Sequence, residues 1–203
     1  ADELIDYMLG DLRHRLEPIG QVQVLRAVAE KAREYLDARK GGADDDEGDA
    51  LRRGQVLRTL GAVFEQEGDT TAAERAFRES MAITEHLLAL HPDDATYRRA
   101  QAIGHTELGA VLARRGDPGA ALEHYKSALL LYDALAAAQL DDVDAQRDLS
   151  MIQDRLADLM TSLGKTDAAE NAVRASLSIT RRLAESRPDD LALQRDVLVG
   201  ENK

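Results

Sequence analysis

The stretch that decides the fold runs LGAVLARRGDPGAALEHYKSA, from Leu108 to Ala128. Its apolar residues recur at helical spacing on both sides of Gly116-Asp117-Pro118. Glycine is favoured just past a helix end, and aspartate caps the helix that follows. Proline is tolerated in a first helical turn because its missing N–H would have no helical partner there. The stretch therefore predicts two antiparallel helices joined by a tight turn.

The same pattern returns along the chain at a constant step of 48 residues. Matching helical segments begin at Leu60, Leu108 and Leu156. A glycine that stops a helical pattern keeps the step, at Gly20, Gly68, Gly116 and Gly164. A second kind of turn carries paired acids where a helix is expected to start, at Asp93-Asp94, Asp141-Asp142 and Asp189-Asp190. We interpret these carboxylates as helix caps rather than catalytic acids.

The period divides the chain into six segments. We expect an N-terminal capping hairpin (1–40), an acidic glycine-rich loop (41–48), repeats at 49–92 and 93–140, a degenerate repeat (141–188), and the first helix of a truncated further repeat (189–203). The register predicts that this last helix would run to about residue 211.

Within a repeat, the apolar residues of the two helices form facing stripes. On one helix these are Leu57, Leu60, Val63 and Phe64, and on its partner Ala73, Ala76, Phe77 and Met81. Gly61 and Ala73 are small residues that we expect where the helices come closest, because a large side chain would wedge the pair apart.

Composition and charge narrow the possible partners. A formal net charge of -12 disfavours nucleic acid and anionic lipid, whose binding depends on clustered Lys and Arg. Without cysteine there is neither a thiolate metal site nor a thiol nucleophile. The five histidines form no metal-binding motif, and no catalytic or cofactor motif is recognisable. We therefore expect no metal and no cofactor. We also expect no membrane span in this fragment and a cytoplasmic location.

These residues resemble the tetratricopeptide repeat (TPR), whose signature sets Leu, Gly and an aromatic on the first helix and Ala, an aromatic and Ala on the second. The repeat at 93–140 matches best, with Leu108, Gly109, Leu112, Gly116, Ala121, Tyr125 and Ala128. The repeat at 141–188 departs from the signature at Ala157, Met160 and Val173. The usual TPR period is about 34 residues, so the excess here corresponds to roughly two extra turns per helix.

Residues 4–38 resemble the segment that precedes long-period TPR arrays in large bacterial signalling or effector proteins. The resemblance implies an all-α, right-handed solenoid of antiparallel helix hairpins. It also implies a concave groove lined by the first helices, and the family's groove positions fall on Gln55, Arg58, Glu65, Gln66, Thr106, Arg114, Asp154 and Asp158.

Three functions remain open on the sequence. We favour a non-catalytic scaffold that binds a protein or peptide, as the sensor or adaptor part of a larger bacterial signalling protein. The second is self-assembly, because stacked repeats expose an apolar edge at the end of an array. The residues of that edge are Leu191, Leu193, Val197 and Leu198. The third is an enzyme or nucleotide-binding regulator with an unrecognised pocket between helices.

Overall fold

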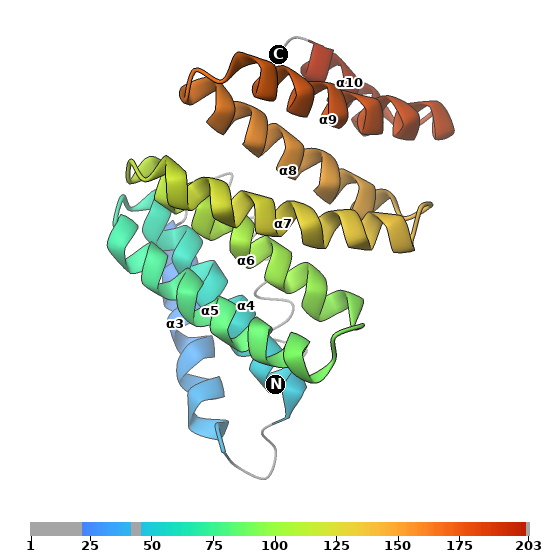
Figure 1. Cartoon of the computed structure of the whole chain (residues 1–203). Helices are drawn as coiled ribbons and strands as arrows, with labels where there is room; N and C mark the ends of the chain where they lie inside the picture. Colours follow the sequence, from blue (N-terminus) through green and yellow to red (C-terminus); the bar gives the residue numbers. More distant parts are fainter. Residues whose placement is uncertain (1–21, 42–45, 202–203) are drawn as a thin grey trace. The chain divides into compact units, whose positions relative to one another are not determined.

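The computed structural model describes residues 22–41 and 46–201, and all regular structure in this part of the chain is helical (Figure 1). The prediction of an all-α fold is confirmed for these residues. The helices are α3 (Val22–Arg39), α4 (Glu47–Gln66), α5 (Thr70–Leu90), α6 (Ala95–Arg114), α7 (Pro118–Ala138), α8 (Val143–Ser162), α9 (Thr166–Ser186) and α10 (Leu191–Glu201). Every second helix begins 48 residues after the one before it. The helices α4, α6, α8 and α10 begin at residues 47, 95, 143 and 191, and α3, α5, α7 and α9 begin at residues 22, 70, 118 and 166.

The chain divides into two compact units, Ala1–Val111 and Leu112–Lys203, with α6 running across the boundary. In the N-terminal unit, α4 packs against both α3 and α5. In the C-terminal unit, α8 packs against α7 and α9, and α10 packs against α9. The right-handed solenoid stays a prediction.

The structure corrects one predicted boundary at the start of α4. The loop expected over residues 41–48 ends before Glu47, because Asp46 caps the helix by accepting a hydrogen bond from the backbone N–H of Asp49 at 2.8 Å. The first half of the predicted capping hairpin lies outside the described residues. Its second half forms α3, which buries Leu25, Ala29, Ala32 and Leu36, whereas Val28 is half-buried.

The two kinds of turn form as the sequence indicates. Gly68, Gly116 and Gly164 adopt positive φ angles of 82°, 86° and 69°, which glycine reaches without steric cost. Asp69 and Asp117 accept hydrogen bonds from backbone N–H groups in the first turns of α5 and α7, at 2.9 Å and 3.0 Å.

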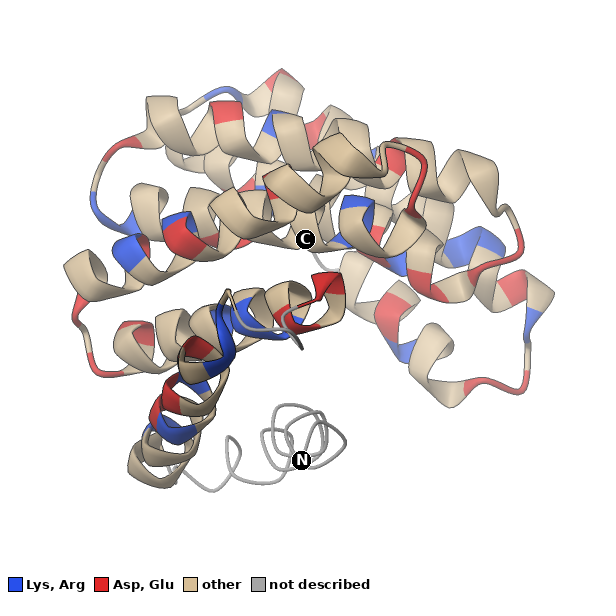
Figure 2. Cartoon of the chain, turned by 90° about the horizontal axis from the view of Figure 1, so that it is seen from below, with Lys and Arg blue, Asp and Glu red and all other residues tan. Residues whose placement is uncertain are grey.

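The paired acids also cap helices. In each pair the second aspartate accepts from a backbone N–H two residues later, at 2.8 Å for Asp94, 2.9 Å for Asp142 and 3.0 Å for Asp190. Figure 2 shows acidic residues at the turns between helices, where negative charge favours the positive end of the helix dipole.

Close packing of α4 on α5 depends on Gly61, one of the small residues expected where the two helices come closest. A Cβ atom on Gly61 would lie 2.4 Å from Cε1 of Phe77, so the ring of Phe77 covers this glycine. Further along the pair, the Ser80 hydroxyl donates to the Gly54 carbonyl at 2.7 Å. The equivalent pair in the C-terminal unit, Ser150 and Ser176, places its hydroxyl oxygens 3.1 Å apart.

A buried carboxylate joins α3 to α4. Asp49 lies 3.0 Å from Arg39 and 3.0 Å from Arg52, one guanidinium on each oxygen. Asp49 is buried, while both arginines remain partly exposed. The two positive partners offset the cost of removing this charge from water.

Candidate functional site

The predicted groove residues of the N-terminal unit lie on α4 and α6 and differ in how much of each side chain reaches the surface. Gln55, Arg58 and Glu65 are half-buried, and Gln66 is exposed. The guanidinium of Arg58 lies 3.8 Å from the Glu107 carboxylate, which joins α4 to α6.

Thr106 is a correction to the predicted groove. It is buried, and its hydroxyl donates to the Ala102 carbonyl at 2.9 Å, one turn earlier in α6. A hydroxyl satisfied within its own helix and covered by neighbours cannot contact a partner in this conformation.

In the C-terminal unit, Arg114 and Asp158 are exposed and Asp154 is half-buried. Of these three, Asp154 lines a cavity of about 510 Å³ formed by α8, α9 and α10. The remaining lining residues are Arg147, Asp148, Ser150, Met151, Ser176, Thr180, Arg195, Asp196, Val199 and Gly200.

This cavity combines a satisfied polar floor with exposed apolar side chains. Ser150, Ser176 and Thr180 are buried and already hydrogen-bonded, the threonine to the Ser176 and Leu177 carbonyls. Met151 on α8 is 38% exposed and Val199 on α10 is 55% exposed. The floor therefore needs no ligand atom to satisfy it, whereas the apolar side chains would gain from being covered.

Charged groups also line the cavity. The guanidinium of Arg147 lies 3.0 Å from the Asp196 carboxylate, which ties α8 to α10. Arg147-Asp148 recurs 48 residues later as Arg195-Asp196, a repetition that by itself indicates only a constant register. The role of Arg147 as a link between helices of successive repeats needed the tertiary contact.

The four residues predicted to form a stacking edge on α10 differ in exposure, and the stacking itself stays a prediction. Leu191 and Leu198 are 82% and 60% exposed, and Val197 is half-buried. Leu193 is fully buried, because it lies on the face of α10 that packs against α9. Val199 is also exposed on α10, although it was not among the predicted residues. The apolar residues of this helix do not by themselves indicate which of its faces packs against α9.

No protein-family model and no curated protein matches this sequence. Among solved structures, the fold is similar to the crystal structure of BtubC (BKLC) from P. vanneervenii, with a TM-score of 0.60. The two sequences are 15% identical, and the match covers 99% of this chain and 82% of that chain. At this identity the similarity concerns the fold alone. None of the helices within residues 22–41 and 46–201 is both long enough and apolar enough to cross a bilayer.

One cluster of titratable groups lies in the N-terminal unit. Glu47, at the start of α4, contacts His91 Nε2 at 2.9 Å and accepts from the Tyr97 hydroxyl at 3.2 Å. The hydrogen bond with His91 is the main cause that lowers the pKa of Glu47, whereas burial, followed by the bond to Glu47, raises the pKa of Tyr97. The His91 and Tyr97 rings lie 5.9 Å apart. These contacts link the start of α4 to the end of α5 and to the first turn of α6.

Burial also raises the pKa of Tyr125, which lies in the core of the C-terminal unit. Among the described residues, no three His, Asp or Glu side chains gather closely enough to hold a metal ion.

Proposed function

We propose that this chain is a non-catalytic binding module that holds a segment of a partner protein in the cavity formed by α8, α9 and α10. The observation that carries the proposal is the exposure of Met151 and Val199 inside a concave space of about 510 Å³. A space of this size accommodates a few side chains of a bound peptide. Covering two exposed apolar groups supplies a driving force for binding.

The charges around the cavity favour a partner segment with basic residues. The lining contains three carboxylates, Asp148, Asp154 and Asp196, against two guanidiniums, Arg147 and Arg195. The whole chain carries a net charge of -12, so its long-range field also attracts cations. We infer that the bound segment presents an apolar side chain flanked by Lys or Arg.

The sequence resemblance extends this proposal to the architecture and its context. The regular 48-residue step of the helix starts supports a TPR-like right-handed solenoid. In the bacterial proteins that residues 4–38 resemble, such arrays accompany signalling or effector domains. We therefore propose a sensor or adaptor role within a larger bacterial protein.

Selection of peptides from a random phage-displayed library tests the proposal. The intact chain should retain peptides rich in apolar residues next to Lys or Arg. The double variant Met151→Glu and Val199→Glu should weaken their binding by about tenfold or more, which corresponds to about 1.4 kcal/mol. Leu130→Glu is the matched control, since Leu130 on α7 is 73% exposed and does not line the cavity. Equal affinities for the wild type and the cavity variant would exclude this site.

Self-assembly is a second candidate, favoured by the exposure of Leu191 and Leu198 on α10. Sedimentation velocity over a range of protein concentrations would reveal it. If these residues mediate assembly, Leu191→Glu with Leu198→Glu should give a monomer at concentrations where the wild type associates. A wild type that stays monomeric throughout would rule this candidate out.

A further inference from the structure

A second cavity, of about 640 Å³, lies in the N-terminal unit, where α3 and α5 flank α4. Its lining residues are Arg33, Asp37 and Lys40 at α3, Ala50, Arg53, Val56 and Leu57 on α4, and Glu79, Ala82, Ile83 and His86 on α5. The groove positions Gln55 and Arg58 are absent from this lining, so the cavity uses a different face of α4.

The floor and walls of this cavity are apolar. Val56 and Leu57 are buried beneath it, Ala50 and Ile83 are half-buried, and Ala82 is exposed. An aliphatic side chain entering here would be surrounded by apolar groups, and its removal from water would stabilise a complex.

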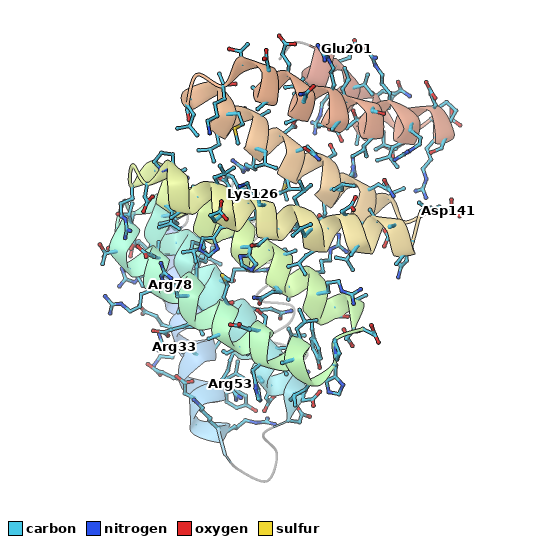
Figure 3. All side chains as sticks on the ribbon, viewed as in Figure 1. Arg33, Arg53, Arg78, Lys126, Asp141 and Glu201 are labelled. Carbon is cyan, nitrogen blue, oxygen red and sulfur yellow. The ribbon has the colours of Figure 1, made fainter. Side chains whose placement is uncertain are left out.

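The rim of the cavity is basic, in contrast to the chain as a whole. It contains three cations, Arg33, Lys40 and Arg53, against two carboxylates, Asp37 and Glu79. Arg33 lies close to both carboxylates, at 3.4 Å from Asp37 and 3.6 Å from Glu79. Figure 3 labels Arg33 and Arg53, which come from α3 and α4.

The corresponding junction in the C-terminal unit carries a longer, polar side chain in place of Ala50. Gln146 occupies the position two 48-residue steps after Ala50. It donates to the Ala136 carbonyl at 3.1 Å and accepts from Arg182 at 3.1 Å. Gln194, one step further on, makes the same bond to the Ala184 carbonyl at 3.2 Å. Arg98, one step after Ala50, instead donates to the Pro92 carbonyl at 2.6 Å. The methyl group of Ala50 can make neither bond, so no polar side chain from this position of α4 reaches across the junction.

We propose that this cavity binds an acidic segment of a partner protein, in which an aliphatic side chain is flanked by Asp or Glu. The aliphatic group enters between Ala50, Ala82 and Ile83, and the flanking carboxylates lie near Lys40 and Arg53. This surface is separate from the α8–α10 cavity, which has the opposite excess of charge, and the proposal does not depend on the function assigned there.

The experiment uses the same phage-displayed library with the full chain and three variants. Lys40→Glu with Arg53→Glu reverses the charge of the rim. Ala50→Gln puts into the cavity the side chain found at the equivalent positions 146 and 194, at no change of charge. Lys31→Glu with Arg78→Glu is the control, because it makes the same change of net charge in α3 and α5 outside the cavity. Circular dichroism confirms that each variant is folded.

The wild type should retain acidic peptides with Leu, Ile, Val or Met. Both cavity variants should weaken these peptides by about tenfold or more, and the control by much less. The proposal is overturned if the retained peptides lack this acidic pattern, or if the cavity variants bind them as the control does. It is also overturned if the chain self-associates in sedimentation and only the cavity variants abolish this, since the occupant is then a second copy. Loss of basic peptides through Met151→Glu and Val199→Glu reports on the α8–α10 cavity independently.

Discussion

The contact between Gly61 and Phe77 predicts a substitution whose effect changes sign with its background. Alanine in place of Gly61 brings a Cβ atom to 2.4, 2.7 and 2.8 Å from three ring carbons of Phe77. Phe77 is buried, so its ring has little room to move away. Overpacking of this kind costs about 1–3 kcal/mol. Alanine also favours a helix interior over glycine by about 1 kcal/mol, which partly offsets the cost.

We therefore expect Gly61→Ala to lower the free energy of unfolding by up to about 2 kcal/mol in the wild type. Phe77→Ala alone should cost about 3–5 kcal/mol because it leaves a cavity. In that background the ring is absent, and Gly61→Ala should raise the stability by about 1 kcal/mol. The coupling between the two substitutions should therefore be about 1–3 kcal/mol.

Urea unfolding followed by far-UV circular dichroism measures the four free energies of this double-mutant cycle. Phe77→Leu replaces Phe77→Ala if the smaller residue leaves too little folded protein. Gly54→Ala is the control in the same helix, because its Cβ would lie 3.6 Å from the nearest atom, Ser80 Oγ, which is an ordinary contact. A change for Gly61→Ala that is the same in both backgrounds, to within about 0.5 kcal/mol, would refute the packing argument.

Four further predictions concern the helix ends and the charged junctions. Asp117→Ala should reduce the free energy of unfolding by about 1 kcal/mol, because Asp117 caps α7. Lys165→Asp should increase the free energy of unfolding by about 0.5–1 kcal/mol, since Lys165 makes no side-chain cap at α9. Urea unfolding measures both changes, and a variant as stable as the wild type would contradict the capping assignment at that helix. Asp49→Ala should cost about 3 kcal/mol in the same assay, since it leaves Arg39 and Arg52 without their shared buried carboxylate; a loss no larger than that of an exposed Asp93→Ala would argue against this. The lowered pKa of Glu47 means that its stabilising contribution is present above pH about 4.3 and is lost as the pH falls through the lower folded-state pKa. Carboxyl NMR titration should therefore show the Glu47 pKa rising toward its ordinary value in His91→Ala, and an unchanged pKa would disprove the assigned cause.

The turns and the helix period were predictable because they depend on local chemistry. Gly116 reaches its positive φ and Asp117 caps the following helix through bonds that span only a few residues. The residues that α3 buries also lie at helical spacing in the sequence. The end of the loop before Glu47 was placed less well, since the acidic run gives no signal for which aspartate acts as the cap.

The candidate site was less predictable, because a surface position depends on contacts between distant segments. Thr106 was placed in the groove by analogy with the family, yet neighbouring helices bury it. Leu193 was placed at an exposed edge, yet it packs within the C-terminal unit. Neither error could be corrected without knowing which face of α6 or α10 meets another helix.

By itself the sequence determined the helical class, the 48-residue step, the turn glycines and the capping aspartates, since each is set by interactions within one or two turns of chain. Only the tertiary structure decided that Phe77 covers Gly61, that Arg147 joins Asp196, and that Ala50 lines a cavity whereas Gln146 bonds across its junction. The physical reason is that packing and cavities depend on the shapes of side chains that meet from separate helices, and helical periodicity fixes which face is apolar but not which side chains touch.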